Sequence, residues 1–207
     1  MCPMKIGILR EEKIPHDKRV PFTPVQCKYL LEQFAELKIV VQPSGFRCYS
    51  DEEYRSHGIV LQEDLGDCDV LMGVKEIPKD KLIPGKKYLF FSHTIKKQAH
   101  NKALLQAIIE KKIQLIDYEC LIDDLGHRVI GFGRFAGLVG AYNGIMAYGL
   151  KYGLFNLKPA HLSHDKKEVF KELEKINLPN LKILVNGGGS VANGDIRSTR
   201  YSESNSL

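Results

Sequence analysis

The stretch CDVLMGVKEIPKDKLIPGKKYLFFSHT, residues 68–94, decides the fold because it holds two short apolar runs that each end in polar side chains. CDVLMGV ends at Val74, and YLFF covers residues 88–91. Each run has the length and composition of a buried strand, and glycine and proline residues separate the two. Lys75 and His93 therefore follow strand ends.

The alternation of strand and helix extends in both directions from this stretch. Before it, the runs KIGIL (5–9) and KIVVQ (38–42) predict strands, and apolar residues at helical spacing predict a helix over 24–34. After it, we expect a helix over about 97–111 and a strand at IQLID, 113–117. Such alternation predicts an α/β fold with a parallel, Rossmann-like sheet.

The segment 134–153 is rich in small residues, which predicts a helix with one nearly bare face. The residues concerned are Gly137, Gly140, Ala141, Gly144 and Ala147. Such a face allows close packing of another helix, or it belongs to a hinge or an interdomain helix.

The sequence LKILVNGGGSVANG, residues 181–194, predicts a strand that leads into a glycine turn. Gly187, Gly189 and Ala192 match the pattern G-x-G-x-x-A, in which glycines let the backbone approach a pyrophosphate at a helix N-terminus. With Gly188 they are the predicted binding residues for NAD or NADP, and a plain glycine turn is the other interpretation. The complete fingerprint needs a helix, a second strand and an acidic residue about 20 positions further on. We therefore expect a truncated dinucleotide-binding domain.

The composition is that of a globular protein with a sizeable core, since 43% of the 207 residues are hydrophobic and 27% are charged. The formal net charge of +5, without a long basic run, favours small anionic substrates over nucleic acid. The five cysteines lack metal-ligand spacing, so we expect no metal site, no disulfide framework and a reducing, cytoplasmic location. No stretch is long and apolar enough to predict a membrane partner.

Two residues at strand ends have side chains suited to proton transfer. A half-buried lysine such as Lys75 can act as an acid or base when its surroundings favour the neutral form. His93 titrates near neutral pH in its unperturbed state. A surface lysine and a structural histidine are the alternatives.

Four further charged residues are candidates for supporting roles. Arg19 and Arg128 could each bind a carboxylate through two parallel hydrogen bonds. Glu76 and Glu119 could orient or tune Lys75. Ordinary surface charges explain all four equally well on spacing alone.

Five sequence blocks occur together and in order, and they carry a resemblance to a known family. They are KRVPFTP (18–24), GVKEIP (73–78), FFSHTIKKQ (90–98), LIDYE (115–119) and HRVIGFGRFAG (127–137). The set resembles the superfamily of alanine dehydrogenase, transhydrogenase and saccharopine dehydrogenase. Within that superfamily, the FFSHT, LIDYE and GFG-x-x-AG blocks are most similar to lysine-forming saccharopine dehydrogenase and lysine-ketoglutarate reductase.

The resemblance implies hydride transfer between NAD or NADP and an imine formed from L-lysine and 2-oxoglutarate, which interconverts these substrates with saccharopine. It implies that Lys75 and His93 are the acid-base pair and that Glu76 and Glu119 tune Lys75. It further implies that Arg19 and Arg128 bind substrate carboxylates.

The resemblance also implies a domain layout. Residues 1–135 would form the substrate domain, 136–180 interdomain helices, and 181–194 the start of an NAD(P)-binding Rossmann domain. The near absence of apolar residues separately predicts a disordered tail over 195–207. We expect the chain alone to lack normal turnover. The alternatives are an alanine dehydrogenase-like enzyme and a non-catalytic remnant that binds a dicarboxylate, and the sequence leaves the oligomeric state open.

Overall fold

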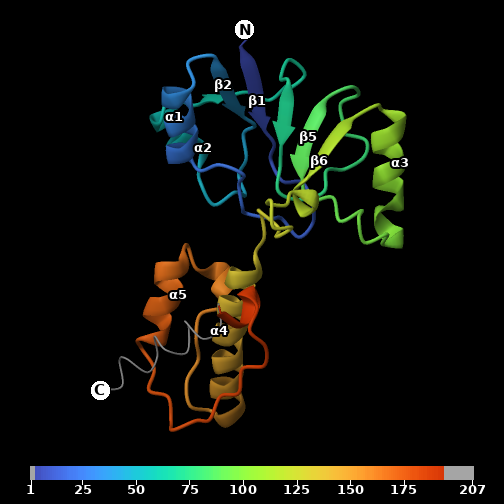
Figure 1. Ribbon diagram of the computed structural model, residues 1–207. Helices are drawn as coiled ribbons and strands as arrows, with labels where there is room; N and C mark the ends of the chain where they lie inside the picture. The colour runs from blue at the N-terminus through green and yellow to red at the C-terminus, as the bar shows by residue number, and fades with distance from the viewer. Residues whose placement is uncertain (1–2, 194–207) are drawn as a thin grey trace. The chain divides into compact units, whose positions relative to one another are not determined.

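The computed structural model describes residues 3–193, and the chain divides into two compact units (Figure 1). The first unit ends at Ile130 and the second begins at Gly131, a few residues before the predicted end of the substrate domain. The predicted tail, 195–207, lies outside the described residues, as does Gly194.

The first unit is built on a six-stranded sheet in the order β3-β2-β1-β4-β5-β6, and every neighbouring pair is parallel (Figure 1). The strands are β1 (Met4–Ile8), β2 (Leu37–Val41), β3 (Val60–Leu61), β4 (Val70–Met72), β5 (Lys87–Phe90) and β6 (Gln114–Asp117). The chain order reverses at β1, which lies between β2 and β4. Open α/β sheets bind ligands beyond the carboxyl ends of their strands near such a reversal. The predicted parallel α/β sheet is confirmed.

Helices cover both faces of this sheet (Figure 1). They are α1 (Pro24–Gln33), α2 (Asp51–Ser56) and α3 (Lys102–Glu110), with short 3₁₀ turns η1 (Ala99–Asn101) and η2 (Tyr118–Cys120). Because side chains alternate along a strand, Ile39 and Val41 of β2 pack in a cluster with Cys27 of α1 and Tyr54 of α2. Val40 points to the opposite face, in the cluster that holds residues of α3. The result is a three-layer unit with a core on each face of the sheet.

The second unit contains the helices α4 (Gly133–Tyr152) and α5 (Lys166–Leu173) and the 3₁₀ turn η3 (Ala160–Leu162). Gly153 ends α4 in a left-handed conformation with φ 64°. Residues of α4 and α5 share one core. That core consists of Leu138, Tyr142, Ile145, Leu157, Val169 and Leu173. None of the described helices is long and apolar enough to cross a membrane.

The strand predicted at the start of residues 181–194 is not formed. Residues 181–188 have no regular secondary structure. A strand needs a neighbour to take its backbone hydrogen bonds, and the described part of the second unit contains no other strand. The glycine turn itself is present and leads into a helical turn over 190–193.

Candidate functional site

Several charged side chains follow the carboxyl ends of adjacent strands in the first unit. Lys75 and Glu76 come after β4, His93 comes after β5, and Glu119 lies in η2 directly after β6. Because β4, β5 and β6 are parallel neighbours, the segments that follow them meet at one edge of the sheet. The strand-end placement expected for Lys75 and His93 is therefore found.

The closest acid-base contact in this group joins His93 and Glu119. The Nδ1 atom of His93 lies 3.2 Å from the Oε2 atom of Glu119, whose side chain is only 4% exposed. This buried oxygen has no hydrogen-bond partner within the described chain. The other oxygen lies 3.7 Å from the ammonium of Lys96 and 3.9 Å from the guanidinium of Arg128. Glu119 is thus a buried carboxylate surrounded by groups that can carry positive charge.

The imidazole ring of His93 lies between two carboxylates. Its Nε2 atom is 3.9 Å from the Oε1 atom of Glu76, on the opposite side of the ring from Glu119. The backbone of His93 has φ 53°, a left-handed conformation that is uncommon for residues other than glycine. The side-chain amide of Asn101 donates a hydrogen bond to the carbonyl of His93 at 3.3 Å. The backbone of His93 is therefore held in a special conformation at this strand end.

Glu76 is paired with Lys13 at 2.7 Å. Burial opposes the ionisation of Glu76, but the hydrogen bonds from Lys13 and from its own backbone and the nearby charges together outweigh it and leave the pKa of Glu76 below its usual value. The contacts of Glu76 are thus with Lys13 and His93, whereas the sequence indicated a role beside Lys75.

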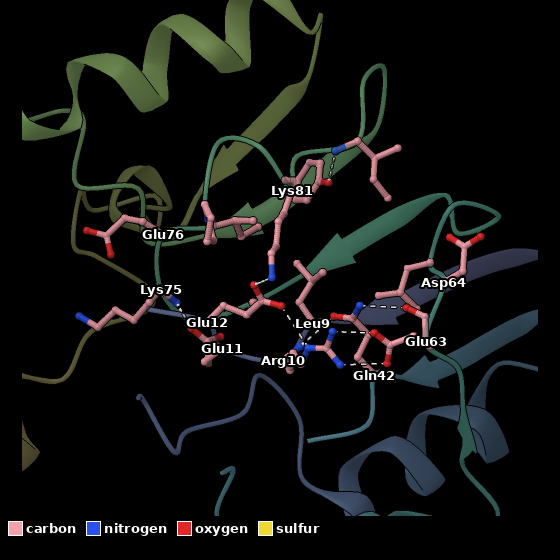
Figure 2. A pocket seen from close by; sticks show the side chains of 16 residues that line it. Leu9, Arg10, Glu11, Glu12, Gln42, Glu63, Asp64, Lys75, Glu76 and Lys81 are labelled. Atoms are coloured by element: carbon pink, nitrogen blue, oxygen red, sulfur yellow. Dashed lines mark hydrogen bonds and ion pairs between the residues drawn. The ribbon is translucent and has the colours of Figure 1, made fainter. Parts of the chain in front are cut away.

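Lys75 lines a pocket of about 140 Å³ at the carboxyl edge of the sheet (Figure 2). Its side chain is half-buried, and within residues 3–193 its ammonium makes no hydrogen bond or ion pair. In Figure 2 the side chains of Lys75 and Glu76 extend away from the ion pair of Arg10 and Glu63 at the other end of the pocket. Lys75 is therefore available to a ligand.

The pocket end opposite Lys75 is closed by a network of ion pairs. Arg10 binds Glu63 through two hydrogen bonds, at 2.9 and 2.6 Å, and Glu12 at 3.1 Å. Lys81 also pairs with Glu12. The charges of these four side chains neutralise one another.

Arg19 is held by Asp17. The Nε atom of Arg19 donates to Asp17 at 2.8 Å, its Nη2 atom contacts the second carboxylate oxygen, and its backbone N–H donates at 3.0 Å. Burial opposes ionisation of Asp17, but these bonds and the charge of Lys75 outweigh it and lower the pKa of Asp17. Arg19 thus binds a protein carboxylate. A substrate carboxylate could bind the same guanidinium beside Asp17 or in its place.

Sequence reasoning missed two acidic side chains, the half-buried Glu11 and the buried Asp117. Glu11 accepts hydrogen bonds from the backbone N–H groups of Val74 and Lys75 at 2.6 and 2.9 Å. Asp117 accepts from the hydroxyl of Ser92 and from the backbone N–H of Glu119 at 2.8 Å. Glu11 stands in the charged run REEK, which is typical of an exposed loop, so no local signal marked it. Asp117 is the last residue of a predicted strand, and a polar residue at a strand end is the same signal that identified Lys75 and His93.

The glycine turn of the second unit has the open backbone that a phosphate requires. Gly187 has φ 103°, which favours glycine. A Cβ atom added at Gly188 or Gly189 would meet nothing within 4 Å. A helical turn begins directly after, with the N–H of Asn193 bonded to the carbonyl of Gly189 at 3.0 Å. This local geometry fits the pyrophosphate of a dinucleotide.

A parallel sheet that reverses its order at β1, with titratable side chains at its carboxyl edge, defines a ligand-binding α/β domain of the Rossmann-like class. Residues 7–139 match the model of the alanine dehydrogenase/PNT N-terminal domain. The chain belongs to this family.

Named relatives agree with this membership. The mitochondrial alpha-aminoadipic semialdehyde synthase of Bos taurus is 40% identical over 146 residues, which are 70% of this chain and 16% of the relative. The lysine-forming, NAD(+)-dependent saccharopine dehydrogenase of Emericella nidulans is 33% identical over 139 residues, 64% of this chain and 36% of the relative. The chain thus spans less than half the length of these relatives.

Solved structures show the same fold. An L-alanine dehydrogenase superposes with a TM-score of 0.58 at 17% identity, covering 74% of this chain and 44% of that one. A transhydrogenase from Sinorhizobium meliloti gives a TM-score of 0.55 at 17% identity, covering 70% and 44%. At this identity the likeness concerns the fold.

Proposed function

We propose that this chain is the substrate-binding part of an NAD(P)-dependent oxidoreductase that interconverts saccharopine with L-lysine and 2-oxoglutarate. The observation that carries the proposal is the contact of 3.2 Å between His93 and the buried Glu119, with Lys75 at the neighbouring strand end. The names of the relatives supply the substrate class.

The reaction needs proton transfers at several steps, and this edge of the sheet holds groups that can perform them. When the amine of lysine adds to the carbonyl of 2-oxoglutarate, the nitrogen loses a proton and the oxygen gains one. Loss of water from that adduct needs a further proton on the leaving oxygen. His93, between Glu119 and Glu76, can hold and deliver a proton, and Lys75 can exchange one from the adjacent strand end.

The carboxylates of the substrates need positive partners. Arg128 and Lys96 lie beside Glu119, and Arg19 stands with Asp17. A guanidinium binds a carboxylate through two parallel hydrogen bonds, so Arg19 and Arg128 are the proposed carboxylate-binding residues.

NAD(P), when bound, would supply or accept the hydride. Gly187, Gly188, Gly189 and Ala192 are the proposed residues for its pyrophosphate, because the turn exposes backbone and opens into a helix.

Calorimetric titration of the chain with 2-oxoglutarate and with pyruvate tests this proposal. We expect 2-oxoglutarate to bind and Arg128→Met and Lys75→Met each to weaken binding about tenfold, because each removes a charge-assisted contact. Lys79→Met, an exposed lysine of the same loop, is the matched control and should leave the affinity unchanged. Equal affinity for pyruvate, or no effect of Arg128→Met and Lys75→Met, would contradict the proposed substrate class.

A further inference from the structure

The turn that carries Lys75 is held by a carboxylate from a different part of the sheet. Glu11 follows β1, and its two oxygens accept the backbone N–H groups of two consecutive residues after β4. The distances are 2.6 Å from Val74 and 2.9 Å from Lys75. One carboxylate therefore bridges both amides of the turn.

This carboxylate continues the backbone ladder beyond the end of β1. The N–H of Leu9 donates to the carbonyl of Met72 at 2.8 Å, and after this point the segments that follow β1 and β4 separate. On the other side, the N–H of Phe91 donates to the carbonyl of Val74 at 3.1 Å. Without Glu11, the N–H of the buried Val74 would lack an acceptor on the β1 side, and unpaired buried amides are costly.

The carboxylate of Glu11 also lies close to the glycine that precedes the turn. A Cβ atom added at Gly73 would lie 3.4 Å from the Oε1 atom of Glu11 and 3.8 Å from the carbonyl oxygen of Lys75. The carboxylate thus lies against the turn, and its hydrogen bonds to the two amides are direct.

We propose that Glu11 is a positioning residue for Lys75: it fixes the backbone from which the Lys75 ammonium projects into the site. Both hydrogen bonds of Glu11 go to the backbone of the turn, so the role assigned to it is exerted through Lys75. Contact between Lys75 and a substrate rests on the proposed function. The two hydrogen bonds from the amides of Val74 and Lys75 to Glu11, here called the backbone clamp, do not.

The test uses nuclear magnetic resonance on the full chain, with Glu11→Ala, Glu11→Gln and the control Glu12→Gln. Glu12 is the next residue along but binds Arg10 and Lys81 instead of the turn. Two quantities are measured: the hydrogen-exchange rates of the Val74 and Lys75 amides, and the chemical shifts of the Lys75 side-chain methylene next to the ammonium.

We expect Glu11→Ala to speed exchange of both amides about tenfold and to shift the Lys75 side-chain signals. Glu11→Gln keeps one acceptor oxygen, so it should have a smaller effect, and Glu12→Gln should have none. If Glu11→Ala does not fold, Glu11→Gln still decides, because it preserves the size of the side chain.

Unchanged exchange in the Glu11 variants would overturn the clamp. Faster exchange with unchanged Lys75 side-chain signals would also overturn the proposal, since Glu11 would then hold the backbone without positioning the ammonium. Failure of the unaltered chain to bind 2-oxoglutarate would count against the proposed function alone, because neither measurement needs a ligand.

Discussion

At the residue scale, the first unit buries ionisable side chains both in the candidate site and away from it. Glu119 is buried beside His93, Lys96 and Arg128. The side chain of Arg47 is equally buried, but it makes its hydrogen bonds in the loop after β2, far from these residues in sequence. Burial of a charge is costly unless partners surround it. The residues around each such side chain must therefore hold their polar groups in contact with it.

Arg47 gives a prediction about stability. Its side chain is 4% exposed, it donates to the carbonyls of Gln42 and Tyr49 at 2.7 and 2.8 Å, and it pairs with Asp51. We expect Arg47→Met to lower the free energy of unfolding by about 3–5 kcal/mol, because two carbonyls lose their donor and Asp51 loses its cationic partner. Urea denaturation measures the change.

The control for Arg47→Met is Arg55→Met. Arg55 is 58% exposed and pairs with Glu52 at 3.4 Å, so its loss should cost less than about 1 kcal/mol. Equal effects of the two substitutions would show that the buried network of Arg47 is not a main source of stability.

Asp17 gives a prediction about pH. Its pKa is lowered from 3.8, since the bonds from Arg19 and the charges of Arg19 and Lys75 together outweigh the effect of burial. A lowered pKa in the folded state means that the ionised carboxylate stabilises the fold above its ordinary pKa and that this contribution is lost as the pH falls through the lowered value. We expect unfolding below about pH 4 to depend less steeply on pH in Asp17→Asn than in the unaltered chain.

Denaturation with urea at a series of acidic pH values measures that slope. The exposed Asp80, changed to asparagine, is the control and should leave the slope in place. An unaltered slope in Asp17→Asn would mean that the pair of Asp17 and Arg19 is not formed in solution.

At the scale of elements, the two units differ in which segments are exposed to ligands: loops in the first unit and a helix face in the second. In the first unit, the segments after β1, β4, β5 and β6 carry the charged side chains, and the strands fix where these segments start. In the second unit, α4 presents an exposed face at Gly140 and Gly144, which border a pocket of about 460 Å³ with residues 181–184. Close packing of another helix on this face is not seen within the described second unit.

The glycines of α4 give a prediction about packing. A Cβ atom added at Gly149 would collide with the ring of Phe155 and lie 2.7 Å from its carbonyl oxygen, whereas one added at Gly144 would meet nothing within 4 Å. We expect Gly149→Ala to lower the free energy of unfolding by about 1–3 kcal/mol. Gly144→Ala should raise it by up to about 1 kcal/mol, since alanine favours the helix.

Thermal and urea denaturation of both variants measure these changes, and each variant is the control of the other. A loss of stability in Gly144→Ala would show that the bare face of α4 is covered in solution by something that needs its glycine.

At the scale of the whole molecule, each hydrophobic core of the described chain lies within one unit. The three clusters of the first unit end at Ile130, and the cluster of the second begins at Leu138. A unit with its own core and complete sheet pairing is expected to fold alone.

We therefore predict that residues 1–130, produced alone, give the amide spectrum that the same residues give in the full chain. Residues 1–110 are the control: they lack β6, which pairs with β5 along its length, and should not give a folded spectrum. A collapsed, poorly dispersed spectrum for residues 1–130 would mean that the second unit is needed for the first to fold.

The sequence predicted those parts of the site that depend on local pattern. Apolar runs placed Lys75 and His93 after strands, because a buried strand of a few residues has a composition that can be read directly. Glu11 could not be found in this way. Its role depends on the separation of two strands that lie far apart in the sequence, and a charged run carries no sign of which carboxylate is turned inward.

The sequence by itself determined the alternating elements, the parallel class of the sheet and the glycine turn, because residue composition and spacing decide these through local backbone preference and burial. Tertiary structure alone decided that β1 lies between β2 and β4, that Glu119 faces His93, and that Glu11 bridges the turn at Lys75. It also decided that residues 181–188 form no strand. Strand pairing and side-chain contacts join residues distant in the chain, so they are settled only when the chain has folded.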